Sequence, residues 1–274
     1  MARILLWNID KGQRDGIIQQ LVHQEKIDIL LLVEFEPGKS GSQLSTLLLT
    51  EGLSRRNQSE KFGVFGRHAH GLNQVSVPFS LGNRVEVWDW MPPSGIPARF
   101  ALVHGLDRIH NDDGTRRVFF RRLVDFIELC ETNAHRRTIV VGDFNANPYE
   151  GSVVSSDGLH AIGVRRVQST TDRHIRWGNK RESFFYNPMW RLFGQQSNMD
   201  AGMSTHFWQN SLAGDVFWHM LDQVVIRPEE CTNFPEDRIR IPTSVGKVTL
   251  IAPDGTPDRT IGSDHLPILF HWNV

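Results

Sequence analysis

The first third of the chain alternates between strand-like apolar runs and apolar residues at helical spacing. Residues 3–9 form an apolar run, residues 17–22 repeat apolar side chains at the spacing of one helix face, and residues 27–33 are apolar almost throughout. This order predicts a strand, an amphipathic helix and a fully buried strand. A second short helix is expected over residues 44–48, ending near Gly52.

The middle of the chain predicts β-structure followed by one long helix. Residues 61–104 lack helical periodicity and hold several β-rich stretches, which predicts consecutive antiparallel strands. Residues 115–133 place apolar side chains on one helical face and charged ones on the other, so Arg116 and Arg117 are expected on a solvated face. A buried strand is expected at residues 138–141.

Three further strands are expected toward the C-terminus, at residues 205–208, 221–226 and 266–272. No Pro-, Gly- or Ser-rich linker, low-complexity stretch or internal repeat divides the sequence. We therefore expect residues 1–274 to form a single domain.

The chain has 30 basic and 31 acidic side chains, so its formal net charge is −1. A molecule without a strong overall field must hold any polyanion by local contacts. The main local excess of positive charge lies in residues 165–191, which contain seven basic and two acidic side chains. The apolar fraction of 39% and the charged fraction of 22% are typical of globular proteins and exclude the disordered, collagen-like and coiled-coil classes.

Only two cysteines, Cys130 and Cys231, are present, and they are far apart. This pattern predicts neither a disulfide framework nor a structural zinc site, and therefore no disulfide-linked partner. The N-terminus lacks the basic start and apolar core of a signal peptide, and no apolar run approaches the roughly 18 residues of a membrane span. A cytoplasmic location without a membrane partner is expected.

Polar side chains that bind metals or move protons stand at the ends of the predicted strands. They are Asn8 and Asp10 after the first strand, Glu34 after the second, His104 after residues 101–103, Asp143 and Asn145 after residues 139–141, Asp222 at the start of its strand, and Asp264 with His265 before the last strand. Strand ends gathered at one rim of a sheet would place these groups in one cleft.

A cleft of this composition suits the hydrolysis of phosphate esters. Glu34, Asp10 and Asp264 carry hard oxygen ligands of the kind that Mg²⁺ prefers, and the ion would neutralise the phosphate and stabilise the leaving oxygen. Two histidines could donate to the non-bridging oxygens, while Asp143 could take a proton from the attacking water.

Some of these residues have alternative interpretations. His265 would need a carboxylate partner to hold its tautomer, and Asp222 is the candidate. Glu36 points to the same strand face as Glu34 and is the alternative ligand. Asp10 could equally be a structural cap. The histidines other than the two at 104 and 265, which include those at 206 and 219, show no usable spacing and are interpreted as surface or supporting residues.

Six motifs resemble the ordered motifs of the endonuclease/exonuclease/phosphatase superfamily, which includes deoxyribonuclease I, exonuclease III, the sphingomyelinases and the inositol polyphosphate 5-phosphatases. They are Trp-Asn-Ile-Asp at 7–10, the glutamate at 34, Val-His-Gly-Leu at 103–106, Gly-Asp-Phe-Asn at 142–145, Leu-Asp at 221–222 and Ser-Asp-His at 263–265. The resemblance covers nearly the whole chain. It implies an α/β (α+β) fold, a four-layered sandwich of two mainly antiparallel sheets packed face to face with helices outside, and a phosphoesterase that depends on Mg²⁺ or Mn²⁺.

The resemblance also implies two groups of site residues. The first group lies at the metal ion and consists of the principal ligand Glu34 with Asn8, Asp10 and Asp264. The second group acts on the water and the phosphate and consists of Asp143, Asn145, His104 and His265 paired with Asp222.

The sequence departs from the superfamily pattern in two places. Exonuclease III and its abasic-site relatives usually place a functional tyrosine between the glutamate and the Gly-Asp-x-Asn motif, whereas Tyr149 and Tyr186 both follow Asn145. This argues against an abasic-site role. Gly105 is inserted after His104 relative to the common His-Leu pair, so a displaced histidine is expected.

The aromatic and basic segment at residues 184–191 has two interpretations of equal standing. It could form an apolar cluster under a long loop, or a platform on which bases stack beside arginine. In the second case the substrate-binding residues would be Arg181, Tyr186, Trp190 and Arg191.

The sequence as a whole predicts a metal-dependent nuclease, endo- or exonucleolytic, that hydrolyses phosphodiester bonds of nucleic acid by in-line attack of an activated water. The first alternative is a phosphatase or phosphodiesterase acting on a small molecule or a lipid headgroup. The second is an inactive binding scaffold with the same fold, although every polar position expected of the active enzymes is filled.

Overall fold

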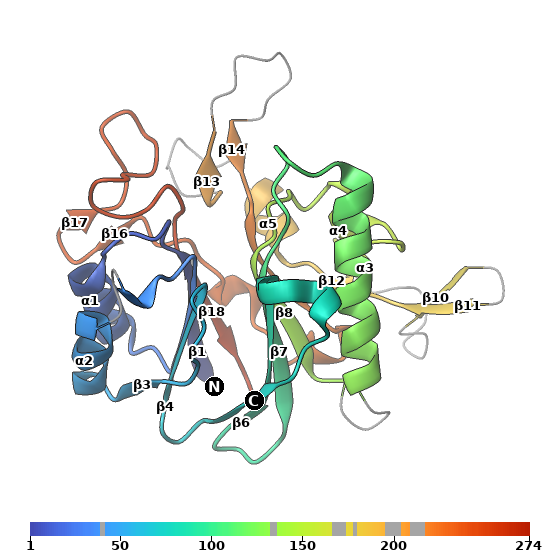
Figure 1. The fold of residues 1–274 in the computed structure, drawn as a ribbon, viewed down its shortest axis with the longest axis horizontal. Coiled ribbons are helices and arrows are strands. Elements are labelled where there is room, and N and C mark those ends of the chain that lie inside the picture. The colour runs from blue at the N-terminus through green and yellow to red at the C-terminus, as the bar shows by residue number, and fades with distance from the viewer. Residues whose placement is uncertain (39–41, 132–135, 166–173, 178–179, 195–203, 209–216) are drawn as a thin grey trace.

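Two mixed sheets lie face to face and helices cover their outer faces, which gives the molecule four layers (Figure 1). The computed structural model describes residues 1–38, 42–131, 136–165, 174–177, 180–194, 204–208 and 217–274; for residues 42, 174–177, 180–182 and 194 it describes the backbone alone. Helices α1 (Asp15–Glu25) and α2 (Ser42–Thr50) lie outside one sheet, and α3 (Asp113–Cys130) and α4 (Gly151–Val154) outside the other (Figure 1).

The first sheet has five strands in the order β18-β1-β2-β4-β3. Its strands are β1 (Ala2–Asn8), β2 (Ile29–Val33), β3 (Leu53–Arg55), β4 (Phe62–Arg67) and β18 (Ile268–Trp272). β1 and β2 are parallel and joined through α1, while the other neighbours are antiparallel. The carboxyl ends of β1 and β2 therefore lie at the same edge.

The second sheet has seven strands in the order β5-β6-β7-β8-β15-β12-β9. Its strands are β5 (Gly71–Val75), β6 (Val85–Met91), β7 (Ala98–His104), β8 (Thr138–Asp143), β9 (Ala161–Ile162), β12 (Phe185–Tyr186) and β15 (Asp222–Ile226). Only the β7–β8 and β12–β9 pairs are parallel. The sandwich of mainly antiparallel sheets implied by the sequence is confirmed.

Shorter elements complete the described chain. They are helix α5 (Met189–Gly194), the hairpins β10 (His174–Trp177) with β11 (Lys180–Ser183), β13 (His206–Phe207) with β14 (Trp218–His219) and β16 (Ser244–Val245) with β17 (Val248–Thr249), and 3₁₀ turns at Phe79–Arg84, Pro228–Glu230 and Glu236–Arg238.

The apolar runs of the sequence are buried because each sheet has protein on both faces. In β8, Ile139 and Val141 belong to the core between the sheets, whereas Val140 packs into the core under α3 with Phe120 and Leu123. Side chains alternate between the two faces of a strand, so a strand covered on both sides needs an unbroken apolar run.

Two sequence predictions need correction. The strands in 61–104 are not one consecutive antiparallel set, because β4 pairs with β2 in the first sheet and the chain then crosses to β5 in the second. Arg116 is not solvated: it is 4% exposed, because it lies on the buried side of α3 together with Phe120 and Leu123. The helix itself spans 113–130, with Asp112 accepting a hydrogen bond from the Thr115 N–H at 2.7 Å as the N-cap.

None of the described helices is both long and apolar enough to cross a membrane. Cys130 and Cys231 are both free thiols, as the sequence predicts.

Candidate functional site

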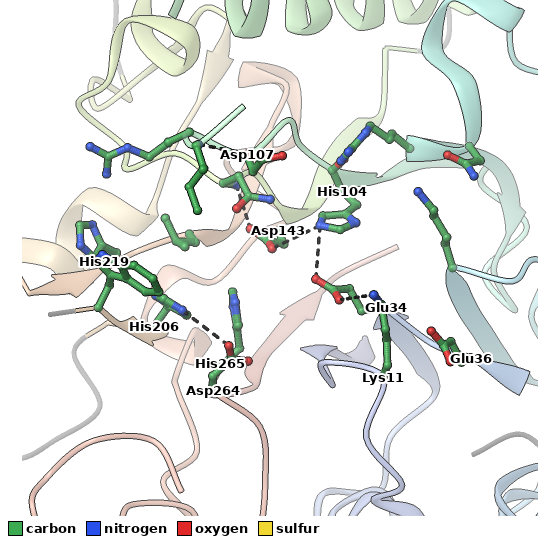
Figure 2. A pocket seen from close by; sticks show the side chains of 18 of the residues that line it. Lys11, Glu34, Glu36, His104, Asp107, Asp143, His206, His219, Asp264 and His265 are labelled. Carbon is green, nitrogen blue, oxygen red and sulfur yellow. Dashed lines mark hydrogen bonds and ion pairs between the residues drawn. The ribbon is translucent and has the colours of Figure 1, made fainter. Parts of the chain in front are cut away.

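The predicted strand ends meet at one rim of the sandwich. In the second sheet His104 lies opposite Asp143 across the β7–β8 pair, and Asp143 lies opposite Asp222 across β8–β15. In the first sheet Asn8 ends β1, and Glu34 directly follows the adjacent β2. The two rims adjoin at a cleft of about 1060 Å³, into which Glu34, His104 and Asp143 project (Figure 2).

Two carboxylates from the two sheets face each other across an amide and an imidazole. Asn8 Nδ2 donates to Asp143 Oδ2 at 3.0 Å and to Glu34 Oε1 at 3.4 Å. His104 Nε2 lies 3.5 Å from Glu34 Oε1 and 3.9 Å from Asp143 Oδ2. One ligand atom from each of Glu34, His104 and Asp143 lies within 4.8 Å of the others, a spacing that one metal ion can bridge.

Asn8 and Asp10 support this group from the side. Asn8 Oδ1 accepts the Asp10 backbone N–H at 3.0 Å, so Asn8 offers its NH₂ group, and not its oxygen, to the carboxylates. Asp10 is exposed and does not line the cleft. Partial desolvation of its carboxyl, followed by the negative charges of Asp264 and Glu34, raises the pKa of this group. Of the predicted metal ligands on these two strands, Glu34 alone presents an oxygen directly to the cleft.

Four residues of this rim have left-handed backbone conformations. The φ angles are 45° at Asp10, 53° at Lys11, 54° at Glu34 and 52° at Asn145. A residue other than glycine held in this region costs on the order of 1 kcal/mol or more, and such residues cluster at functional sites. Of these four residues, Lys11, Glu34 and Asn145 line the cleft, so the strained backbone lies directly at the site.

Asp222 and His265 form the tightest side-chain pair of the site. His265 Nδ1 lies 2.6 Å from Asp222 Oδ2, and both residues are buried. Burial disfavours the charged ring, but Asp222, with Asp143 and Asp264, raises the pKa of His265 to about 10. His265 Nε2 is then left to face the cleft that the residue lines.

Asp143 and Asn145 are held by the turn after β8. Asp143 Oδ1 accepts the Asn145 backbone N–H at 2.8 Å, and Asn145 Nδ2 donates to the Gly105 carbonyl at 3.2 Å. Burial would favour a neutral Asp143, but His265 and then His104 lower the pKa of its carboxyl. Gly105 is required here, because a Cβ at this position would lie 2.2 Å from the Phe144 carbonyl oxygen.

His104 is half-buried beside the carboxylates, and this burial lowers the pKa of its imidazole. Arg84 donates from Nη1 to the Gly105 carbonyl at 2.9 Å and to the His104 carbonyl at 3.4 Å, which anchors the end of β7. His104 Nδ1 has no hydrogen-bond partner among the described residues.

The sequence interpretation missed two histidines of the cleft, His206 and His219. They are paired across the β13–β14 hairpin and line the cleft beside Asp264 and His265 (Figure 2). His219 stands three residues before Asp222 in the chain, which was an available signal. No local spacing relates His206 to its neighbours in space.

Arg116 was also missed, and it supports the turn after β8. Its Nη1 donates to Glu150 Oε2 at 3.0 Å and its Nη2 to the Asn145 carbonyl at 2.6 Å. Glu150 Oε1 in turn accepts the Asn147 N–H at 2.8 Å, and Asn147 Nδ2 lies 2.9 Å from His219 Nδ1. The Arg116–Glu150 ion pair thus connects α3 to the turn at Asn145 and, through Asn147, to His219.

The aromatic segment at 184–191 does not line the cleft. Tyr186 donates to Glu236 Oε2 at 2.9 Å, Arg191 donates to the Glu236 carbonyl, and Trp190 packs near Gly163. Tyr186 belongs to the core between the sheets, and the substrate-binding role of this segment stays a prediction. The side chain of Arg181 and most of the positive segment 166–182 lie outside the described residues.

The cleft is charged on both sides of its centre. Its described lining includes the cations Lys11, Lys61, Arg84 and Arg108 and the acids Glu34, Glu36, Glu60, Asp107, Asp143 and Asp264. Lys61 is half-buried, and burial, with Arg84 next, lowers the pKa of its amine. Trp208 and Tyr149 add exposed aromatic surface to the lining.

Comparison with solved structures finds the same fold. The human Nocturnin catalytic domain with bound sulfate is 16% identical, with a TM-score of 0.58 over 98% of this chain and 92% of that one. An AP endonuclease from Archaeoglobus fulgidus is 14% identical, with a TM-score of 0.57 over both whole chains. A 3′-5′ exonuclease from Neisseria meningitidis is 13% identical, with a TM-score of 0.57 over 99% and 100%.

Comparison with curated protein sequences finds no match. The model of the Endonuclease/Exonuclease/phosphatase family matches residues 5–265, which include every strand end described above. The chain therefore belongs to the Endonuclease/Exonuclease/phosphatase family.

Proposed function

We propose that the protein is a divalent-metal-dependent phosphoesterase that cleaves phosphodiester bonds of nucleic acid. The observation that carries this proposal is the convergence of Glu34, His104 and Asp143 from two sheets, beside the Asp222–His265 pair, in one open cleft.

The residues at the centre fit a hard divalent ion. Glu34 and Asp143 bring carboxylate oxygens together, and within the described chain the cation nearest to Glu34 is Lys11, whose Nζ is 4.0 Å from Oε2. Carboxylate oxygens with open positions for water suit Mg²⁺ or Mn²⁺. Glu34 would hold the ion with Asp143 beside it, and the ion would neutralise phosphate charge and stabilise the leaving oxygen. Asn8 would align the two carboxylates through its NH₂ group.

The remaining residues then have distinct roles. Asp143, kept ionised by its neighbours, accepts the proton of the attacking water. His265, held charged by Asp222, donates from Nε2 to a non-bridging phosphate oxygen, and His104 contacts a second oxygen. Asn145 lies beside the phosphate, and Asp264 borders the same space as His265.

Nucleic acid is the proposed substrate because four cations line the open cleft around this centre. Side chains of this kind contact the phosphates that flank a scissile bond. The names of an AP endonuclease and an exonuclease among similar structures agree with this choice.

The direct test is hydrolysis of single- and double-stranded DNA and RNA with Mg²⁺ or Mn²⁺. We expect cleavage of at least one of them by the wild type and none above background by Asp143→Asn, which keeps the shape but not the base. Absence of cleavage of all of them would remove the nuclease assignment.

A small phosphate ester is the second candidate, because acids outnumber cations in the described cleft lining and the chain is close to neutral. Salt separates the two candidates. A nuclease that contacts several phosphates loses affinity steeply as salt rises, whereas a small substrate gives a nearly flat response.

A further inference from the structure

A second group of ligand atoms lies beside the proposed catalytic centre. His206, Asp264 and His265 each offer one ligand atom within 4.8 Å of the others. His206 and His265 are partners in an antiparallel β-bridge, which fixes their rings with centroids 4.5 Å apart. The group lies on the opposite side of the cleft from Lys11 and Glu36 (Figure 2). The two imidazoles are therefore close together because their backbones are paired.

His206 lacks the hydrogen bonds expected of a buried imidazole. It is 8% exposed, and its Nδ1 is buried without a partner among the described residues. Its Nε2 lies 3.8 Å from Asp264 Oδ2, too far for a hydrogen bond. Buried polar atoms are normally satisfied, so an imidazole in this state calls for an explanation such as an ion.

His265 is oriented as metal-binding histidines are. Its Nδ1 is held by Asp222 at 2.6 Å, and its Nε2 is left for the cleft. A carboxylate on the far nitrogen fixes the tautomer and the ring direction of a metal ligand. Asp264 also pairs with Arg259 at 3.1 Å, but the Arg259 side chain is 60% exposed and can be displaced at little cost.

We propose that His206, Asp264 and His265 form a second cation site that selects metals with a preference for nitrogen ligands, such as Zn²⁺ or Co²⁺. Two imidazoles with one carboxylate and an open position suit these ions, whereas the oxygen-rich centre at Glu34 suits Mg²⁺. The inference rests on the proposed function in one respect. An ion on His265 Nε2 removes the N–H that the phosphate contact needs, so occupancy by Zn²⁺ inhibits the Mg²⁺-dependent reaction.

The first test measures binding without any substrate. Co²⁺ is titrated into the metal-free protein and its visible d–d absorption is followed. The wild type should bind one nitrogen-coordinated Co²⁺, and His206→Gln and Asp264→Asn should each weaken this binding at least about tenfold. Glu34→Gln should leave it within about twofold, because Glu34 belongs to the other centre. Circular dichroism establishes that each variant is folded.

The matched control is His219→Gln. His219 is buried on the same hairpin with its ring centroid 6.4 Å from that of His206, but it is not in the ligand group. It should bind Co²⁺ like the wild type. The proposal is overturned if the wild type shows no such absorption, if His206→Gln and Asp264→Asn bind as the wild type does, or if His219→Gln weakens binding as much as they do.

The second test uses inhibition. Zn²⁺ is added to the Mg²⁺ reaction, and the concentration for half-inhibition is scaled to each variant's own uninhibited rate. His206→Gln should require at least about ten times more Zn²⁺ than the wild type. Equal sensitivity would refute the inhibitory role. Because the Co²⁺ titration uses no substrate, a failure to hydrolyse any phosphate ester overturns the proposed function without affecting the binding result.

Discussion

The Asp222–His265 pair should set the upper pH limit of the proposed reaction. Burial opposes the charged ring, yet Asp222, 2.6 Å from Nδ1, together with Asp143 and Asp264, raises the pKa of His265 to about 10. Asp222→Asn keeps the size of the side chain but removes its charge. The pKa of His265 should then fall toward the unperturbed value of about 6.5.

The size of the effect follows from the charged fraction of His265. At pH 8, a ring with a pKa of about 10 is about 99% charged, whereas one with a pKa of about 6.5 is about 3% charged. The variant should therefore lose about 30-fold in kcat/KM at pH 8, and less than about twofold at pH 6 from protonation alone. The measurement is the profile of kcat/KM between pH 5.5 and 10, with saturating Mg²⁺ and one substrate.

The control for this prediction is Thr205→Val. Thr205 Oγ1 accepts the Asp222 backbone N–H at 3.1 Å, so the control removes a buried hydrogen bond at the same place without removing the charge. Its upper pH limit should stay close to that of the wild type. An Asp222→Asn loss of the same size at pH 6 and pH 8 would refute the reasoning, because it would mean that Asp222 only positions the ring.

Three further predictions concern stability. The pKa of His265 is raised in the folded state, so its contribution to stability is complete below about pH 6.5 and is lost as the pH rises toward about 10. The difference in unfolding free energy between wild type and Asp222→Asn, measured by urea titration, should therefore shrink across that range. Arg116→Met should cost about 2 kcal/mol in the same assay, because it removes the ion pair to Glu150 and the donor to the Asn145 carbonyl, whereas Arg117→Met, at an exposed pair, should change stability by less than about 0.5 kcal/mol. Gly142→Ala should destabilise the protein by at least about 3 kcal/mol, since the added Cβ would lie 2.0 Å from the Val103 carbonyl oxygen at a φ of 147°. Gly16→Ala, in open space on α1, should stabilise the protein by about 0.5–1 kcal/mol, and equal melting temperatures for the two variants would contradict this.

The centre of the site was predictable because strand order is encoded locally. Each apolar run ends in a polar group, and neighbouring strands bring their ends together, as with His104 opposite Asp143. The need of His265 for a carboxylate partner predicted its pairing with Asp222, and the two side chains are in contact. The roles assigned to these residues remain predictions.

Other features could not be predicted because they depend on contacts between distant segments. His206 is joined to His265 by a single β-bridge that no periodicity marks. Arg116 shares the buried side of α3 with Phe120, but its partners, Glu150 and the Asn145 carbonyl, come from a distant turn that no local pattern relates to it. The alternation that predicts a strand is the same in either sheet, so nothing local assigned β4 and β5 to different ones.

The central claim is that strand ends from both sheets bind one divalent ion and one phosphate. The most direct measurement is anomalous scattering from crystals soaked with Mn²⁺ and phosphate. The account predicts a manganese peak within coordination distance of Glu34, adjoining Asp143, with the phosphate between His104 and His265. A fully occupied manganese that does not touch Glu34, or a phosphate bound outside this cleft, would contradict it.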